Sequence, residues 1–134
     1  MSGLRGLLRD LRGAAALEFA LVGLPFILLM FGLVEFGRGL HIRNGLEDAA
    51  DRAQRALLID PAAGAGAIET EVRTAFRAGS LDRLTVTIAN PVSGANVRTV
   101  TLTYRMDLLL PAPLGRTIPI VSARRVLVHP SQGP

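Results

Sequence analysis

The sequence contains no cysteine, no tryptophan and no lysine. Without cysteine the chain has no disulfide, no thiolate metal site and no thiol nucleophile. Its aromatic content of 4% argues against a stacking surface for carbohydrate or for single-stranded nucleic acid. These absences exclude several kinds of chemistry and do not by themselves assign a location.

The charge of the chain does not indicate a nucleic-acid partner. All 15 basic residues are arginine, and with 11 acidic residues they give a formal net charge of +4. Beyond the N-terminal segment the densest basic group is the pair Arg124 and Arg125. A nucleic-acid-binding surface needs a denser basic stripe. We therefore expect no nucleic-acid partner.

One long apolar run, Ala14–Val34, holds a single charged residue, Glu18. As a helix at about 1.5 Å per residue the run is about 31 Å long, which matches a bilayer core of about 30 Å. A chain of 134 residues is too small to surround a helix that is apolar on every face, so a transmembrane helix is favoured over a buried core helix. Arginines before the run predict a cytoplasmic N-terminus and an extracytoplasmic C-terminal part.

The position of the small residues argues against a conventional secretory signal peptide. Signal peptidase cuts after small residues that follow the apolar run, whereas here Val34 is followed by Glu35 and Phe36. The small residues, 13–16, precede the run instead. A cut at that place removes the basic leader and keeps the apolar helix on the mature protein.

Glu18 lies about 6 Å into the run, where an ionised carboxylate is disfavoured by up to about 3 kcal/mol. One explanation is a side chain that reaches back to the headgroups or stays protonated. The other involves Gly13. If the chain is cut after Gly13, the new α-amino group of Ala14 and the Glu18 carboxylate lie four residues apart on one helix face. The two charges can then neutralise each other, within one subunit or between neighbouring subunits.

The stretch Arg12–Phe19 resembles the type IV prepilin processing site, in which a glycine precedes a mature segment with glutamate at its fifth position. Two further features indicate which prepilin-like subclass the chain resembles. They are the short arginine-bearing leader and the stretches Leu24–Arg38 and Ile42–Ala53. Together they are similar to the TadE-like proteins of the tight-adherence (Flp) pilus system. The resemblance extends from residue 9 to about residue 58.

This resemblance implies a minor pseudopilin-like structural or assembly protein of a Flp-type pilus. A prepilin peptidase would cut it between Gly13 and Ala14, and Glu18 and Phe19 would serve in processing and assembly. Its other partners would be the membrane, pilins, pseudopilins and pilus assembly proteins. It would reside in the bacterial inner membrane as a single-pass protein, with the pilus as a second location. The alternative is an unprocessed single-span protein whose extracytoplasmic domain is a protein-interaction module.

Helical periodicity continues after the apolar run. Apolar residues at helical spacing predict an amphipathic helix over 42–59, which continues from the membrane helix as a stalk. The opposite face is expected to form ion pairs of Asp48 with Arg52 and of Asp51 with Arg55.

The rest of the chain predicts a small α+β domain. A short helix is expected over 68–77, after a break in the Ala/Gly tract 62–67. Beyond it the periodicity changes to two, which predicts a small antiparallel sheet with one face against the amphipathic helix. The expected strands are 84–88, 99–106 and 118–128, with connections at 90–96 and 111–115.

We therefore predict an α+β fold in which a long N-terminal helix is followed by a short helix and a small antiparallel sheet. The expected parts are a cytoplasmic leader (1–13), a transmembrane helix (14–36), an amphipathic stalk helix (37–60), a small extracytoplasmic α+β domain (61–128) and a disordered tail (129–134).

Residues that could carry chemistry are few. His41 and His129 are the only imidazoles, and neither has a carboxylate at a metal-ligand spacing, so His41 is interpreted as an interfacial or surface residue. The sequence has no glycine-rich phosphate loop and no nucleophile with a base and an orienting group. We expect no catalytic residue, no metal site, no cofactor and no small-molecule substrate, and hence no enzyme.

Overall fold

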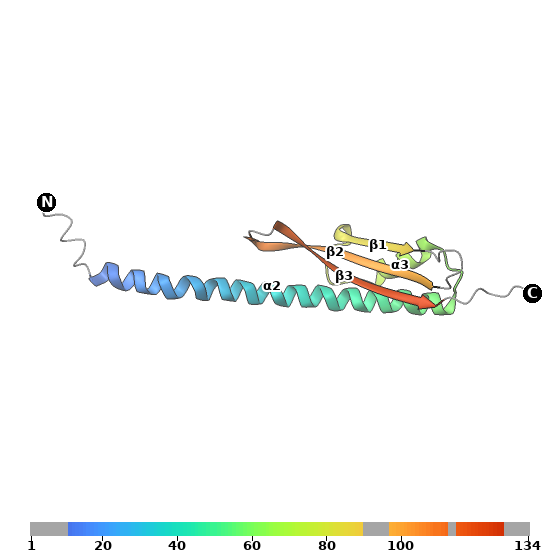
Figure 1. The fold of residues 1–134 in the computed structure, drawn as a ribbon, viewed down its shortest axis with the longest axis horizontal. Coiled ribbons are helices and arrows are strands. Elements are labelled where there is room, and N and C mark those ends of the chain that lie inside the picture. The colour runs from blue at the N-terminus through green and yellow to red at the C-terminus, as the bar shows by residue number, and fades with distance from the viewer. Residues whose placement is uncertain (1–10, 90–96, 113–114, 128–134) are drawn as a thin grey trace, which may run out of the picture. The chain divides into compact units, whose positions relative to one another are not determined.

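The computed structural model describes residues 11–89, 97–112 and 115–127. The chain divides into two compact units, Met1–Phe36 (unit 1) and Gly37–Pro134 (unit 2). The fold is α+β, as predicted. The elements shown in Figure 1 are α2 (Leu11–Ile59), α3 (Ala65–Ala75), the 3-10 helix η1 (Leu81–Arg83), β1 (Leu84–Ala89), β2 (Val97–Ala112) and β3 (Gly115–Leu127).

Helix α2 is one helix of 49 residues, so the predicted membrane and stalk segments form a single element. Leucine, methionine and alanine are strong helix formers, and they outweigh the glycines along this segment. The helix continues through Pro25, a residue that membrane helices tolerate. It begins at Leu11, before the predicted start at Ala14.

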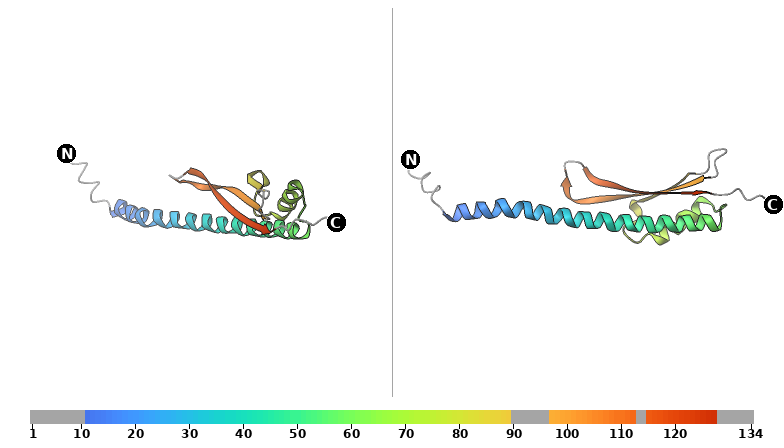
Figure 2. Two further views of the ribbon diagram at one scale, coloured as in Figure 1. Left: turned by 45° about the vertical axis from the view of Figure 1, so that its right-hand side comes forward. Right: turned by 60° about the horizontal axis from the view of Figure 1, so that its bottom comes forward.

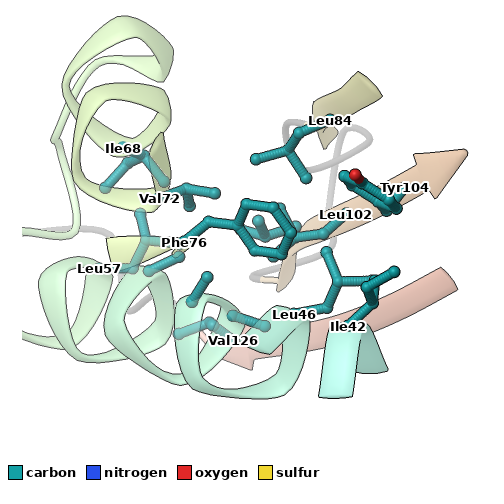
Figure 3. Packing of buried hydrophobic residues seen from close by; sticks show 14 of the residues in the cluster. Ile42, Leu46, Leu57, Ile68, Val72, Phe76, Leu84, Leu102, Tyr104 and Val126 are labelled. Carbon is teal, nitrogen blue, oxygen red and sulfur yellow. The ribbon is translucent and has the colours of Figure 1, made fainter. Parts of the chain in front are cut away.

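Unit 2 is a three-stranded antiparallel sheet, in the order β1-β2-β3, covered on one face by helices. Figure 2 shows α3 and the C-terminal part of α2 on the same side of this sheet. Alternate residues of β2 face the helices, which confirms the predicted period of two. Figure 3 shows the resulting core, whose largest fully buried side chains are Leu46, Leu57, Ile68, Leu102, Val72, Val100 and Val126.

The second and third strands are longer than predicted. Strand β2 continues through Pro111, and Ala112 pairs with Gly115, so most of the expected 111–115 loop belongs to a β2–β3 hairpin. The register shifts between Asp107 and Ala112, which is where the proline interrupts regular pairing. The predicted strands were too short because β2 and the edge strand β3 continue to pair with each other beyond the core.

Helix α3 also begins earlier than predicted. It starts at Ala65, so the Ala/Gly tract is not entirely a helix break. The backbone N–H groups of Ala67 and Ile68 donate to the carbonyl of Gly64, and alanine readily completes this first turn. The helix ends at Ala75, and the Phe76 side chain enters the core. The predicted connection at 90–96, the leader up to residue 10 and the tail 129–134 lie outside the described residues.

The ion pairs on α2 differ from the predicted ones. Asp51 Oδ1 accepts a hydrogen bond from Arg124 Nε of β3 at 2.9 Å, because Asp51 lies where the helix meets the sheet. Neither Asp48 with Arg52 nor Asp51 with Arg55 forms a pair in the described part of the chain. All of these groups are partly exposed, so such pairs contribute at most about 1 kcal/mol each.

Arg98 of β2 joins the sheet to the connection between the two helices. Its side chain is buried, and Nη1 donates to the carbonyls of Pro61 at 3.1 Å and of Ala63 at 2.8 Å. A charged donor shared between two backbone acceptors makes strong hydrogen bonds. Arg98 therefore fixes how α2 turns into α3. Sequence analysis did not predict this role.

Gly45 lies where α2 approaches the segment after α3. A Cβ atom at this position would lie 2.5 Å from Ala78 Cβ, so something must shift. Gly45→Ala is therefore expected to lower the free energy of unfolding by about 1–2 kcal/mol, despite the better helix propensity of alanine. Thermal unfolding of the full chain in detergent, followed by the fluorescence of its one tyrosine, measures this change.

Gly37→Ala is the matched control on the same helix. A Cβ atom there meets nothing within 4 Å, so only the propensity gain remains. That variant should be as stable as the wild type or more stable by up to about 1 kcal/mol. Equal stabilisation by both alanines would contradict the close approach at Gly45.

Candidate functional site

The residues predicted for processing lie together at the start of α2. Gly13, Ala14, Glu18 and Phe19 are all exposed, and the exposed fraction of Phe19 is 81%. The structure thus brings all four onto about two turns of one helix.

The Gly13–Ala14 peptide bond lies in the first turn of α2. Glycine has a low helix propensity, so Gly13 weakens the helix at this place.

Glu18 follows the first turn of α2, which contains no acidic residue. Ala14 and Glu18 are four residues apart and share one face of the helix.

The part of α2 that belongs to unit 1 exposes its apolar side chains on every side. None of its most apolar stretch is buried, and the helix is long and apolar enough to cross a membrane. Large apolar side chains are exposed from Leu17 to Phe36. One apolar N-terminal helix of this kind fits a single-pass membrane protein.

Residues 13–55 match the family model of TadE-like proteins, which confirms the resemblance over this segment. The TadE-like family is a pilus structural family. The match covers α2 and none of the sheet. No curated protein and no solved structure matches the chain.

Other polar groups form no recognisable catalytic or metal site in the described residues. No group of three His, Asp or Glu side chains lies close enough to hold a metal ion there. His41 is exposed, as expected, and His129 lies outside the described residues.

A hollow of about 370 Å³ lies at the Gly37 end of unit 2 and was not predicted. Arg38, His41 and Tyr104 line it from α2 and β2. No sequence signal could have found it, because Tyr104 is distant along the chain and is brought there by the fold.

Proposed function

We propose that this chain is a minor pseudopilin-like subunit of a Flp-type pilus, processed after Gly13 by a prepilin peptidase. The observation that carries the proposal is the match to TadE-like proteins, which begins at Gly13. The exposed apolar helix and the spacing from Gly13 to Glu18 support it. In this proposal Gly13 and Ala14 form the cleavage site, and Glu18 and Phe19 serve in processing and assembly.

The proposed orientation places the arginine-bearing leader in the cytoplasm and unit 2 outside it. Cleavage at the cytoplasmic end leaves the apolar helix in the bacterial inner membrane, with a charged amino group at Ala14. Glu18 of the same or a neighbouring subunit neutralises that group. Pairing between subunits makes the assembled state more favourable than an isolated subunit in the membrane, because an unpaired charge in lipid is costly.

Unit 2 is, in this proposal, an interaction domain without enzymatic activity. Its closed apolar core leaves the surface for contacts with other pilins, pseudopilins and assembly proteins. The alternative of an unprocessed single-span protein uses the same domain in the same way. The two proposals differ in the fate of the first 13 residues and in the need for Glu18.

The first test is the intact mass of the protein from the membrane fraction of cells that contain the prepilin peptidase. We expect a mature chain that begins at Ala14. A Gly13→Leu variant should keep the full mass, because the processing site that the chain resembles has glycine before the cut. A Gly32→Leu variant is the matched control, since it changes a glycine of the same helix far from the proposed cut. A wild-type chain that retains residues 1–13 would instead support the unprocessed alternative.

A further inference from the structure

The direction of the sheet relative to α2 can be followed within unit 2. Arg98, near the start of β2, contacts Pro61 and Ala63 just beyond the end of α2. Met106, further along β2, reaches Gly39: its Cε lies 3.9 Å from where a Cβ of that glycine would be. Strand β2 therefore runs antiparallel to α2. The part of β2 around Met106, and Ile118 of β3 that pairs with it, accordingly lie at the Gly37 end of unit 2.

This end of unit 2 exposes apolar side chains. Leu40 of α2, Leu109 of β2 and Ile118 of β3 are exposed by 43%, 55% and 45%. The sequence from Leu108 to Gly115 contains no charged residue. Such side chains are costly to leave in water but are favourable in the interfacial region of a bilayer.

The hollow at the same end supplies polar groups. Arg38 and His41 line it on α2, and Tyr104 lines it on β2. Tyr104 is 4% exposed, and its ring packs on Phe76 with centroids 5.4 Å apart. Its hydroxyl lies against Gly79, which leaves no room for a larger residue. Arginine, imidazole and a phenol together provide several hydrogen-bond donors for an anionic oxygen.

The apolar segment enters unit 2 at Gly37, so the bilayer surface lies at this end if that segment spans the membrane. Basic and aromatic residues beside exposed apolar ones are typical of protein surfaces at the lipid headgroups. We propose that the hollow binds the phosphate of an anionic phospholipid, with Arg38, His41 and Tyr104 as its ligands, while Leu40, Leu109 and Ile118 contact the lipid interface. This inference rests on the proposed membrane span but not on cleavage or pilus assembly.

The fluorescence of Tyr104 can test the proposal directly, because the chain has one tyrosine and no tryptophan. The full chain is placed in phosphatidylcholine vesicles that contain phosphatidylglycerol. Either lipid carries a nitroxide quencher at the upper end of its acyl chain. We expect labelled phosphatidylglycerol to be enriched about fivefold at Tyr104 over labelled phosphatidylcholine, as one basic residue at an anionic surface allows. Equal quenching by the two labelled lipids would overturn the proposal.

Arg38→Gln should reduce this preference to nearly that of phosphatidylcholine. Arg125→Gln, which removes the same charge from an exposed position on β3, should keep it. Equal losses in both variants would mean that net charge, not the hollow, attracts the lipid. If Arg38→Gln lowers the unfolding temperature, the proposal is judged only on the preference of the wild-type chain for labelled phosphatidylglycerol over labelled phosphatidylcholine.

Inorganic phosphate separates a lipid site from a general anion site. Added at the concentration of labelled phosphatidylglycerol, it should leave the quenching of Tyr104 unchanged. Displacement of the lipid by phosphate would refute a lipid-specific site. The intact mass of the same samples reports cleavage independently, so failure of this inference and failure of the proposed function are distinguishable.

Discussion

Glu18→Ala is expected to reduce the number of pili by at least about tenfold. If the chain is processed as proposed, the change leaves the ammonium of Ala14 without a counter-charge in the apolar part of α2. A loss of about 1.4 kcal/mol in the contact between subunits already gives a tenfold loss of assembly. The burial of an unpaired charge can cost more than that. Electron microscopy of pili, with the amount of mature protein in the membrane as reference, measures the effect.

Glu35→Ala is the matched control, because it removes a carboxylate from the same helix but outside the proposed processing segment. It should leave the number of pili close to that of the wild type. Intact mass of the Glu18 variant separates the two roles of this residue: an uncut chain indicates recognition by the peptidase, and a cut chain indicates assembly. Normal piliation of the Glu18 variant would favour the unprocessed interaction module.

The second large effect is expected in the core of unit 2. Leu46 of α2 is fully buried and packs between the helices and the sheet (Figure 3). Leu46→Ala removes apolar contacts and leaves a cavity, which should lower the free energy of unfolding by about 2–5 kcal/mol. Thermal unfolding in detergent, followed through Tyr104, measures this loss in the full chain.

Leu58→Ala provides the comparison for this prediction. Leu58 is on the same helix, but its exposed fraction is 59%, so truncation leaves no cavity. Its effect should stay below about 0.5 kcal/mol. Similar losses for both leucines would show that Tyr104 does not report the unfolding of this core.

Local patterns were sufficient to predict most elements of the fold. The apolar run and the helical spacing that follows it predicted one long helix, and the alternation along β1 and β2 predicted two paired strands. These predictions succeeded because side-chain periodicity reflects which face of an element is buried. The length of the β2–β3 hairpin was missed, since it depends on pairing between strands and not on burial.

Long-range polar contacts could not be predicted. Arg98 and Arg124 resembled any exposed arginine in the sequence, yet one binds the backbone after α2 and the other binds Asp51. Their partners are known only once the strands are placed on the helix. The proposed cleavage site stays a prediction. It rests on the spacing of Gly13 and Glu18 along one helix, which the sequence contains directly.

The antiparallel course of β2 along α2 has a mechanical consequence. A force that pulls α2 along its axis enters unit 2 at Gly37 and reaches the sheet through side chains distributed from Ile42 to Leu57. All of these contacts bear the force together as the helix slides along the sheet. They do not break one after another. Unit 2 should therefore resist extraction along the helix axis much better than it resists peeling of β3 from the free edge of its sheet.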